Sequence, residues 1–188
     1  MTLTHILPSL RRSLPNPLDR DSWPEFTTTT PDDVTIAGVS LVRLADWCGT
    51  PCVHTATAIL PGTGGLPSPT ELTSVIVARV LAVTLTGDGS ADAWIDARLS
   101  GSAVVMKEAR MIGRVSTARD FAVRVRSPYD EDAPADAVYL GNDLRQGDLL
   151  AIPCRGTALL RSVDPDRHRL VRDGGEPDSF FLPPHCGR

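Results

Sequence analysis

From Leu72 onward, runs of apolar residues are separated by turn residues, and this pattern predicts one strand after another. The longest run, 74–86, is rich in Val, Ile, Leu and Thr and ends at the turn Gly87 to Gly89. The other segments expected to form strands are 34–36, 52–58, 91–99, 102–106, 109–116, 121–126, 138–140, 148–153, 157–163 and 168–172. Many short strands joined by Gly and Pro turns are typical of an all-β sandwich or barrel.

One short helix is expected at 40–47. Leu41, Leu44 and Ala45 have helical spacing, Ser40 can cap the first turn, and Gly49 ends the segment. The predicted fold is therefore mainly β. It is a compact antiparallel β-barrel or sandwich of about seven to nine strands, with one short helix and an N-terminal arm.

The first 31 residues differ in pattern from the rest of the chain. Prolines at positions 8, 15, 17 and 24 forbid a long helix. A structureless tail rarely carries many large apolar residues. Those of this segment are Ile6, Leu7, Leu10, Leu14, Leu18, Trp23 and Phe26. We expect residues 1–31 to form an arm or lid, residues 32–188 a single β-barrel domain, and residues 61–69 a Gly/Pro loop.

Composition narrows the possible partners and locations. Hydrophobic residues make up 41% and charged residues 22% of the 188 residues, which is typical of a soluble globular protein. The formal net charge of −4 argues against a nucleic-acid partner. No segment reaches the roughly 20 apolar residues that span a bilayer, and the N-terminus lacks the residue order of a signal peptide. Four cysteines are too few for a disulfide scaffold, so we expect a cytoplasmic protein with no membrane partner.

Three phrases of the sequence carry a resemblance to a known family. The first is GVSLVRLADWCGTP at 38–51, the second GRVSTARD at 113–120, and the third QGDLLAIPCRGTALL at 146–160. Their order and spacing resemble pyridoxal-phosphate decarboxylases of the diaminopimelate and ornithine decarboxylase type. The resemblance implies the β-domain of such an enzyme, with the loop at 61–69 standing where the family has its α/β barrel.

The resemblance also implies that the parent chemistry has been lost. The barrel that carries the family's cofactor lysine has no counterpart in this sequence. Ser116 stands where the family has a catalytic cysteine, Thr117 where it has a glutamate, and Ala158 where it has a tyrosine that contacts the cofactor phosphate. We therefore expect no cofactor and no autonomous decarboxylase activity.

Seven residues are candidates for a functional site. The candidate catalytic residues are Ser116, Asp120 and Asp96, and the candidate substrate-binding residues are Trp94, Arg98, Arg155 and Thr117. If the family's geometry is kept, most of them converge on the edge that faced the barrel. A carboxylate beside an arginine in a half-buried cleft can transfer protons or anchor a substrate. The alternative is a surface salt bridge, which contributes little.

Metal and covalent chemistry are weaker alternatives. Thiols and imidazoles that could bind zinc occur at Cys48, Cys52, His54, Cys154, His185 and Cys186. The Cys-x3-Cys spacing is not a standard zinc pair, so we expect buried or incidental thiols and no metal. Lys107, the only lysine, could form a Schiff base, but a solvated position after a strand is the simpler interpretation.

Three functions fit this sequence. The first is a cofactor-independent β-barrel, derived from a decarboxylase, that binds a hydrophobic small molecule and acts as a cyclase or isomerase of secondary metabolism. The second is a non-catalytic subunit that homodimerises or docks onto a full-length pyridoxal-phosphate decarboxylase. The third is a stable remnant without activity. An enclosed apolar pocket near Trp94 and Ser116 would favour the first, and a flat apolar patch at 113–120 and 153–158 the second.

Overall fold

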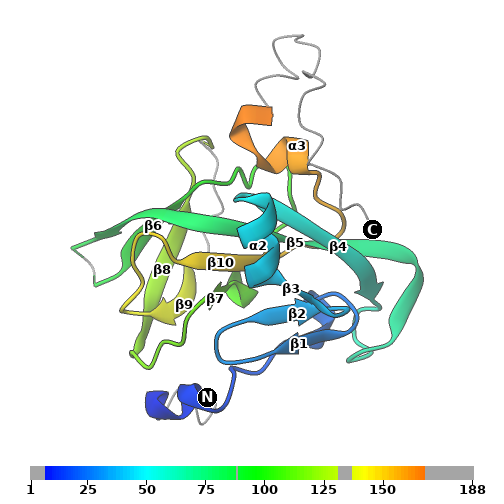
Figure 1. Ribbon diagram of the computed structural model, residues 1–188, viewed down its shortest axis with the longest axis horizontal. Coiled ribbons are helices and arrows are strands. Elements are labelled where there is room, and N and C mark those ends of the chain that lie inside the picture. The colour runs from blue at the N-terminus through cyan, green and yellow to red at the C-terminus, as the bar shows by residue number, and fades with distance from the viewer. Residues whose placement is uncertain (1–6, 88, 131–136, 168–188) are drawn as a thin grey trace, which may run out of the picture.

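One long strand, β5 (Pro67–Leu85), organises the computed structural model of this protein, which describes residues 7–87, 89–130 and 137–167 (Figure 1). Its first half pairs with two strands, so that Val77 lies opposite both Cys52 and Ala151. Its second half turns onto a third strand, where Leu85 lies opposite Ala91. The β-branched residues of the segment suit such a central position, because they pack well on a pleated surface.

The main sheet has the strand order β7-β10-β5-β6-β8-β9, and β4 also pairs with β5. Its other strands are β4 (Cys52–Ile59), β6 (Ala91–Ile95), β7 (Arg110–Ile112), β8 (Asp120–Arg126), β9 (Ala137–Gly141) and β10 (Leu149–Pro153). The pairs are antiparallel except β6 with β8, where Ala91 lies opposite Val123 in a parallel ladder. The predicted mainly β fold is confirmed, with one parallel pair that the local sequence pattern did not indicate.

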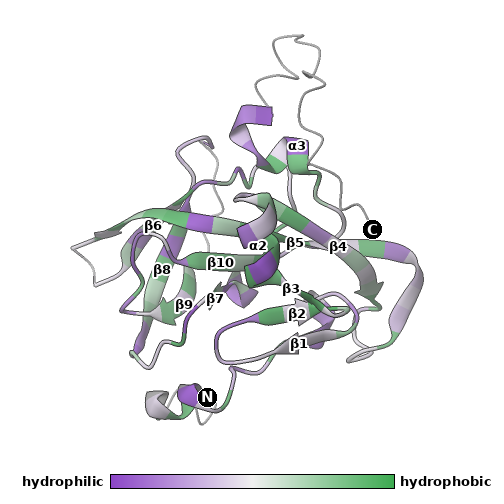
Figure 2. Cartoon of the chain, viewed as in Figure 1, coloured by the Kyte–Doolittle hydropathy of each residue, from purple (hydrophilic) through white to green (hydrophobic). Residues whose placement is uncertain are grey.

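Both faces of the central strands are buried, and each face has its own core. Ile76, Ala78 and Val80 of β5 belong to the first core cluster, together with residues of β6, β8 and β9. Val75 and Val77, which alternate with them, belong to the second. This period of two is the geometry of a strand, whose successive side chains point to opposite faces. Figure 2 shows hydrophobic segments on β10, β8 and β2, in keeping with two buried layers.

A small second layer covers the outer face of β5 and β10. It consists of the sheet β1-β2-β3 and helix α2, with bounds β1 (Thr27–Thr29), β2 (Val34–Ile36), β3 (Val39–Ser40) and α2 (Leu41–Cys48). Ser40 caps the helix as predicted, because its Oγ accepts a hydrogen bond of 3.1 Å from the Arg43 amide. Leu41 and Ala45 of α2 are buried against Ile36 and the β5 side chains of the second core.

The arm segment joins this second layer. It contains two 3₁₀ turns, η1 (Pro8–Arg12) and η2 (Arg20–Ser22). Trp23 follows η2 and is 1% exposed within the second core, while the Glu25 amide donates 2.8 Å to the Thr57 carbonyl of β4. Strand β1 lies before residue 31 but pairs with β2 after it. The division into an arm and a domain at residue 31 stays a prediction.

Several predicted strands are wrong in type or length. Residues 157–163 were expected to be a strand but include the short helix α3 (Leu160–Val163), because Gly156, with φ +87°, turns the chain out of the sheet. Segment 102–106 forms only one bridge, Val104 with Cys154, before the 3₁₀ turn η3 (Met106–Glu108). The strand expected at 109–116 is limited to β7, and 168–172 lies outside the described residues.

In the described part of the chain, no helix combines the length and the apolar character needed to cross a bilayer.

Candidate functional site

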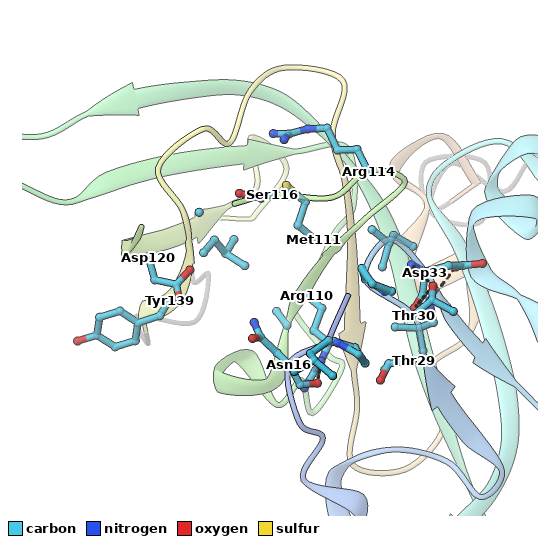
Figure 3. Close-up of a pocket in the computed structure, with 18 residues that line it drawn as sticks. Asn16, Thr29, Thr30, Asp33, Arg110, Met111, Arg114, Ser116, Asp120 and Tyr139 are labelled. Atoms are coloured by element: carbon cyan, nitrogen blue, oxygen red, sulfur yellow. Dashed lines mark hydrogen bonds between the residues drawn. The ribbon is translucent and has the colours of Figure 1, made fainter. Parts of the chain in front are cut away.

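Two clefts that contain predicted site residues lie where the arm meets the main sheet. The first, which we name the seam cleft, runs between the edge strands β7 and β9 and has a volume of about 90 Å³. Its lining includes Asn16, Asp33, Arg110, Ser116 and Asp120. Figure 3 shows Asp120 and Tyr139 on one side of this cleft and Thr29, Thr30 and Asp33 on the other. The seam cleft thus combines segments that are far apart in the sequence.

Ser116, a predicted catalytic residue, is held inside a polar network. It is buried, and its hydroxyl donates a hydrogen bond of 2.6 Å to Asp143 Oδ1. Arg114 binds the other oxygen of Asp143 at 2.7 Å and makes a two-pronged ion pair with Asp148 at 2.8 and 2.7 Å. The network connects the segment after β7 with the turn between β9 and β10.

The electrostatics of this network favour ionised partners. The hydrogen bonds that Arg114 donates to Asp148 raise its pKa above the usual range; burial lowers this pKa, but the hydrogen bond donated to Asp143 raises it further. Burial raises the pKa of Asp143, but the hydrogen bonds from Ser116 and Arg114 outweigh it, so the pKa is lower than that of an ordinary carboxyl. A carboxylate of lowered pKa is a weak base, so Asp143 is poorly suited to activate the Ser116 hydroxyl.

Two other predicted residues lie near Ser116. Asp120 begins β8 and lines the seam cleft, as does Ser116. Thr117, between them in sequence, is exposed and is absent from the lining of the cleft. The structure therefore brings together Ser116 and Asp120 of the predicted set.

Asp96 lies elsewhere, beside the irregularity in the pairing of β5 with β6. Its carboxylate accepts a hydrogen bond of 2.6 Å from the Thr50 hydroxyl and one of 2.8 Å from the Arg79 amide. Burial raises the pKa of Asp96 above the ordinary value, and the two hydrogen bonds lower it only in part. Asp96 thus connects the loop after α2 to the main sheet, and it does not line the seam cleft.

Trp94 and Arg98 are also separate from the seam cleft. Trp94 lies in β6, opposite Ala82 of β5 and Arg126 of β8, and it is half-buried. Arg98 forms an ion pair of 3.3 Å with Asp130, whose carboxylate also accepts a hydrogen bond of 2.5 Å from the Ser100 hydroxyl. None of the three clefts is lined by both Trp94 and Ser116, so these clefts do not supply the pocket that would favour the first of the three functions.

The second cleft, which we name the arm cleft, contains the remaining predicted residue. It has a volume of about 770 Å³ and is lined by Asp19, Trp23, Ile59, Leu72, Lys107 and Arg155, among others. Arg155 is exposed, and its amide donates 2.7 Å to the Ala103 carbonyl. The Lys107 ammonium lies 3.8 Å from the Asp19 carboxylate, and its side chain is 66% exposed. Arg155 and Ser116 therefore belong to different clefts, beyond opposite ends of β10.

The segments 113–120 and 153–158 expose little apolar surface, which does not favour the second of the three functions. Among the large hydrophobic residues described in these two segments, Val115 is the one that is exposed, with 38% of its surface accessible. The predicted homodimer or decarboxylase partner stays a prediction.

The thiols are held in ordinary structural surroundings. Cys52 and Cys154 are buried, and burial raises the pKa of each to about 12, whereas Cys48 is exposed. In the ranges that the structure describes, no group of three His, Cys, Asp or Glu side chains could hold a metal ion. His185 and Cys186 lie outside these ranges.

Sequence reasoning missed the charged partners of the seam cleft. Arg110, Arg114, Asp143 and Asp148 were not predicted as site residues, although Arg114 lies two positions before Ser116. Asp143 and Asp148 flank a turn, where acidic residues are common for local reasons. Their partner is 29 or 34 positions away, and nothing in the local pattern indicates it.

Comparisons with known proteins give little beyond this geometry. No protein-family model matches the sequence, and no curated protein matches it. Among solved structures, the chain is similar to arginine decarboxylase of Paramecium bursaria Chlorella virus, in a form bound to agmatine at 20% identity and in a second structure at 18% identity. The TM-score is 0.36 for each, and the alignments cover 44% and 48% of this chain.

The matched region is a small part of those decarboxylases, because it covers 24% and 28% of their chains. A likeness of this degree does not establish the fold, the activity or the ligand of this protein. The sequence predicted a member of the diaminopimelate and ornithine decarboxylase family. The comparisons give only this weak similarity to a decarboxylase, so the family stays a prediction.

Proposed function

We propose that this protein is a cofactor-independent binding protein for a small hydrophobic molecule, which it holds in the arm cleft. The observation that carries the proposal is the size of the cleft. Its volume of about 770 Å³ lies within the range of about 300–1,000 Å³ that is usual for small-molecule sites. One wall is the segment around Trp23, which agrees with the idea that the arm closes over a ligand.

The lining suggests an apolar ligand that carries an acidic group. Leu72, which is 51% exposed, offers an apolar surface, and the buried side chains of Trp23 and Ile59 lie behind the wall of the cleft. The Arg155 side chain makes no hydrogen bond or ion pair to the described part of the chain, so its guanidinium is available to a carboxylate or sulfonate. Lys107 adds a second positive charge at the rim.

The acidic residues of the arm cleft offset these charges only in part. Asp21 accepts hydrogen bonds from the Gly62 and Gly64 amides, at 2.7 and 3.0 Å. Asp19 accepts a hydrogen bond of 2.9 Å from the Ser22 hydroxyl and forms an ion pair with Lys107. Both carboxylates are therefore engaged by the protein itself, and Glu71 is the remaining acid in the lining.

Catalysis of a cyclisation or isomerisation in this cleft would depend on positioning and on exclusion of water. Ser116 and Asp120 cannot assist there, because they line the seam cleft. Binding is therefore the part of the proposed function that the geometry supports best, and a reaction is its extension.

A fluorescent apolar acid tests the proposal. Anilinonaphthalene sulfonate should bind the folded protein with one saturable site, and Arg155→Gln should weaken binding about tenfold, since it removes a charge-assisted hydrogen bond. The matched control is Arg119→Gln, which removes an exposed arginine remote from the arm cleft. Equal affinities of the two variants, or no saturable binding by the unaltered protein, would overturn the proposal.

A further inference from the structure

Two buried polar atoms in the seam cleft have no partner in the described structure. They are the side-chain oxygen of Asn16, Oδ1, and the Nε of Arg110. Both residues line the cleft. Buried donors and acceptors are nearly always paired, because their desolvation is otherwise uncompensated. One unpaired donor and one unpaired acceptor on the same small cavity therefore indicate a missing binding partner.

The guanidinium of Arg110 is held rigidly beside Asn16. Its Nη1 donates a hydrogen bond of 2.6 Å to the Asn16 carbonyl, and its Nη2 donates to the Pro17 carbonyl. Its central carbon lies 6.0 Å from the centre of the Trp23 ring. These contacts use the two terminal nitrogens and leave the Nε–H as the unpaired donor. Figure 3 shows Asn16 and Arg110 next to each other in the cleft.

We propose that the seam cleft binds an amide group. The carbonyl oxygen of the amide would accept the Nε–H of Arg110, and its N–H would donate to Asn16 Oδ1. A cavity of about 90 Å³ has room for such a planar group but not for a whole drug-sized molecule, so the rest of the ligand would extend through the mouth near Tyr139.

An amide fits these groups better than the alternatives do. A carboxylate has no donor for Asn16 Oδ1, and it would also face the acidic side chains of Asp33 and Asp120 in the same lining. A cation would face Arg110. The burial that lowers the pKa of Arg110 also limits the access of water to its side chain. The site is separate from the arm cleft, so the two proposals can fail independently.

The side-chain ¹H–¹⁵N resonance of Arg110 Nε gives a direct readout in the full chain. Titration with N-methylacetamide should shift this resonance saturably, whereas acetate and tert-butanol at equal concentrations should not. Acetamide and a capped glycine (N-acetylglycine N-methylamide) distinguish the source of the amide. Tighter binding of the capped glycine would indicate a peptide main chain, and tighter binding of acetamide a primary amide of a small molecule.

Two variants complete the test. Asn16→Ala and Arg110→Lys should each weaken N-methylacetamide binding about tenfold. Arg119→Lys, at an exposed position outside the cleft lining, should leave it unchanged. If Arg110→Lys does not fold, Asn16→Ala alone decides, with resonances of the cleft as the readout. The proposal is wrong if no saturable shift occurs, if tert-butanol shifts the resonance equally, or if Asn16→Ala binds as the unaltered protein does. In those cases a bridging water satisfies the two atoms.

Discussion

At the residue scale, Gly141 shows how closely the seam cleft is built. It ends β9 and is buried against Ser116 and Asp143. A Cβ atom at this position would lie 2.7 Å from Asp143 Oδ1 and would also collide with the Ser116 hydroxyl. The glycine is therefore needed for lack of space, although its backbone is outside the left-handed region.

Substitution of this glycine tests the geometry. Gly141→Ala should lower the free energy of unfolding by about 1–3 kcal/mol, because the new methyl group forces apart the hydrogen bond from Ser116 to Asp143. Gly87→Ala is the matched control, since a Cβ there meets nothing within 4 Å. Urea unfolding of both variants measures the difference, and similar values for the two would show that the network tolerates the methyl group.

The sequence allowed Ser116 to be singled out but not its partners. Ser116 stands in a phrase that could be compared with a known family, whereas Asp143 lies in an unremarkable turn 27 residues later. The pairing of Asn16 with Arg110 spans 94 positions. Long-range contacts of this kind depend on strand order, which hydrophobic pattern does not specify.

At the scale of elements, the Arg114 network joins the connection between β7 and β8 to the turn between β9 and β10. Asp148 is 7% exposed and depends on Arg114 and the Arg145 amide for its hydrogen bonds. A buried carboxylate that loses its partner is costly. The network thus fixes two connections that contain few other buried side chains.

The pH dependence of stability follows from Asp143. The pKa of the Asp143 carboxyl is lower in the folded protein than in the unfolded chain, where it is about 3.9. The stabilisation that the ionised carboxylate gives the folded state is therefore fully present above about pH 3.9, and it is lost as the pH falls through the folded-state pKa. Asp143→Asn should reduce the free energy of unfolding by about 1 kcal/mol at pH 7, a modest value because Asp143 is partly exposed. The deficit should shrink below about pH 4.

Urea unfolding between pH 3 and pH 7 measures this deficit. Asp46→Asn, at an exposed position of α2, serves as the control and should show little change at any pH. A deficit for Asp143→Asn that stays constant or grows as the pH falls would contradict the assigned pKa direction.

Element type was predictable where the local pattern was strong. The helix expected at 40–47 is present as Leu41–Cys48, with Ser40 as its cap. The strand predicted at 157–163 was wrong because its apolar residues are also compatible with a helical turn. The direction of this segment is set by Gly156 and by the hydrogen bond from the Ala158 amide to the Ser74 hydroxyl. Strands β1 and β3 were missed because three and two residues carry no usable periodicity.

At the scale of the whole molecule, two cores share one pair of strands. Leu150 and Ile152 of β10 face the first core, whereas Leu149 and Ala151 face the second. The mainly β class was predictable from the number of short strands. The second layer was not, because a strand buried on both faces has no polar face to indicate where its neighbours lie.

The shared strands predict cooperative unfolding of both layers. Trp23→Ala, in the second core, should lower the free energy of unfolding by about 4 kcal/mol through loss of buried apolar contact. Trp47→Ala should change it little, since Trp47 is 76% exposed. Far-ultraviolet circular dichroism and the fluorescence of the two tryptophans that each variant keeps should report one coincident transition in each variant. An earlier transition confined to one probe would show that the second layer unfolds separately.

Lys107 gives the molecule a chemical property that follows from composition and position together. It is the only lysine in the sequence, and its side chain projects at the rim of the arm cleft. An amine-directed reagent at mildly alkaline pH therefore finds one lysine side chain, and a dye attached there is placed within reach of Asp19 on the opposite wall. Once a label on Lys107 is separated from label on the α-amino group, its fluorescence would record how far the segment around Trp23 moves from the main sheet.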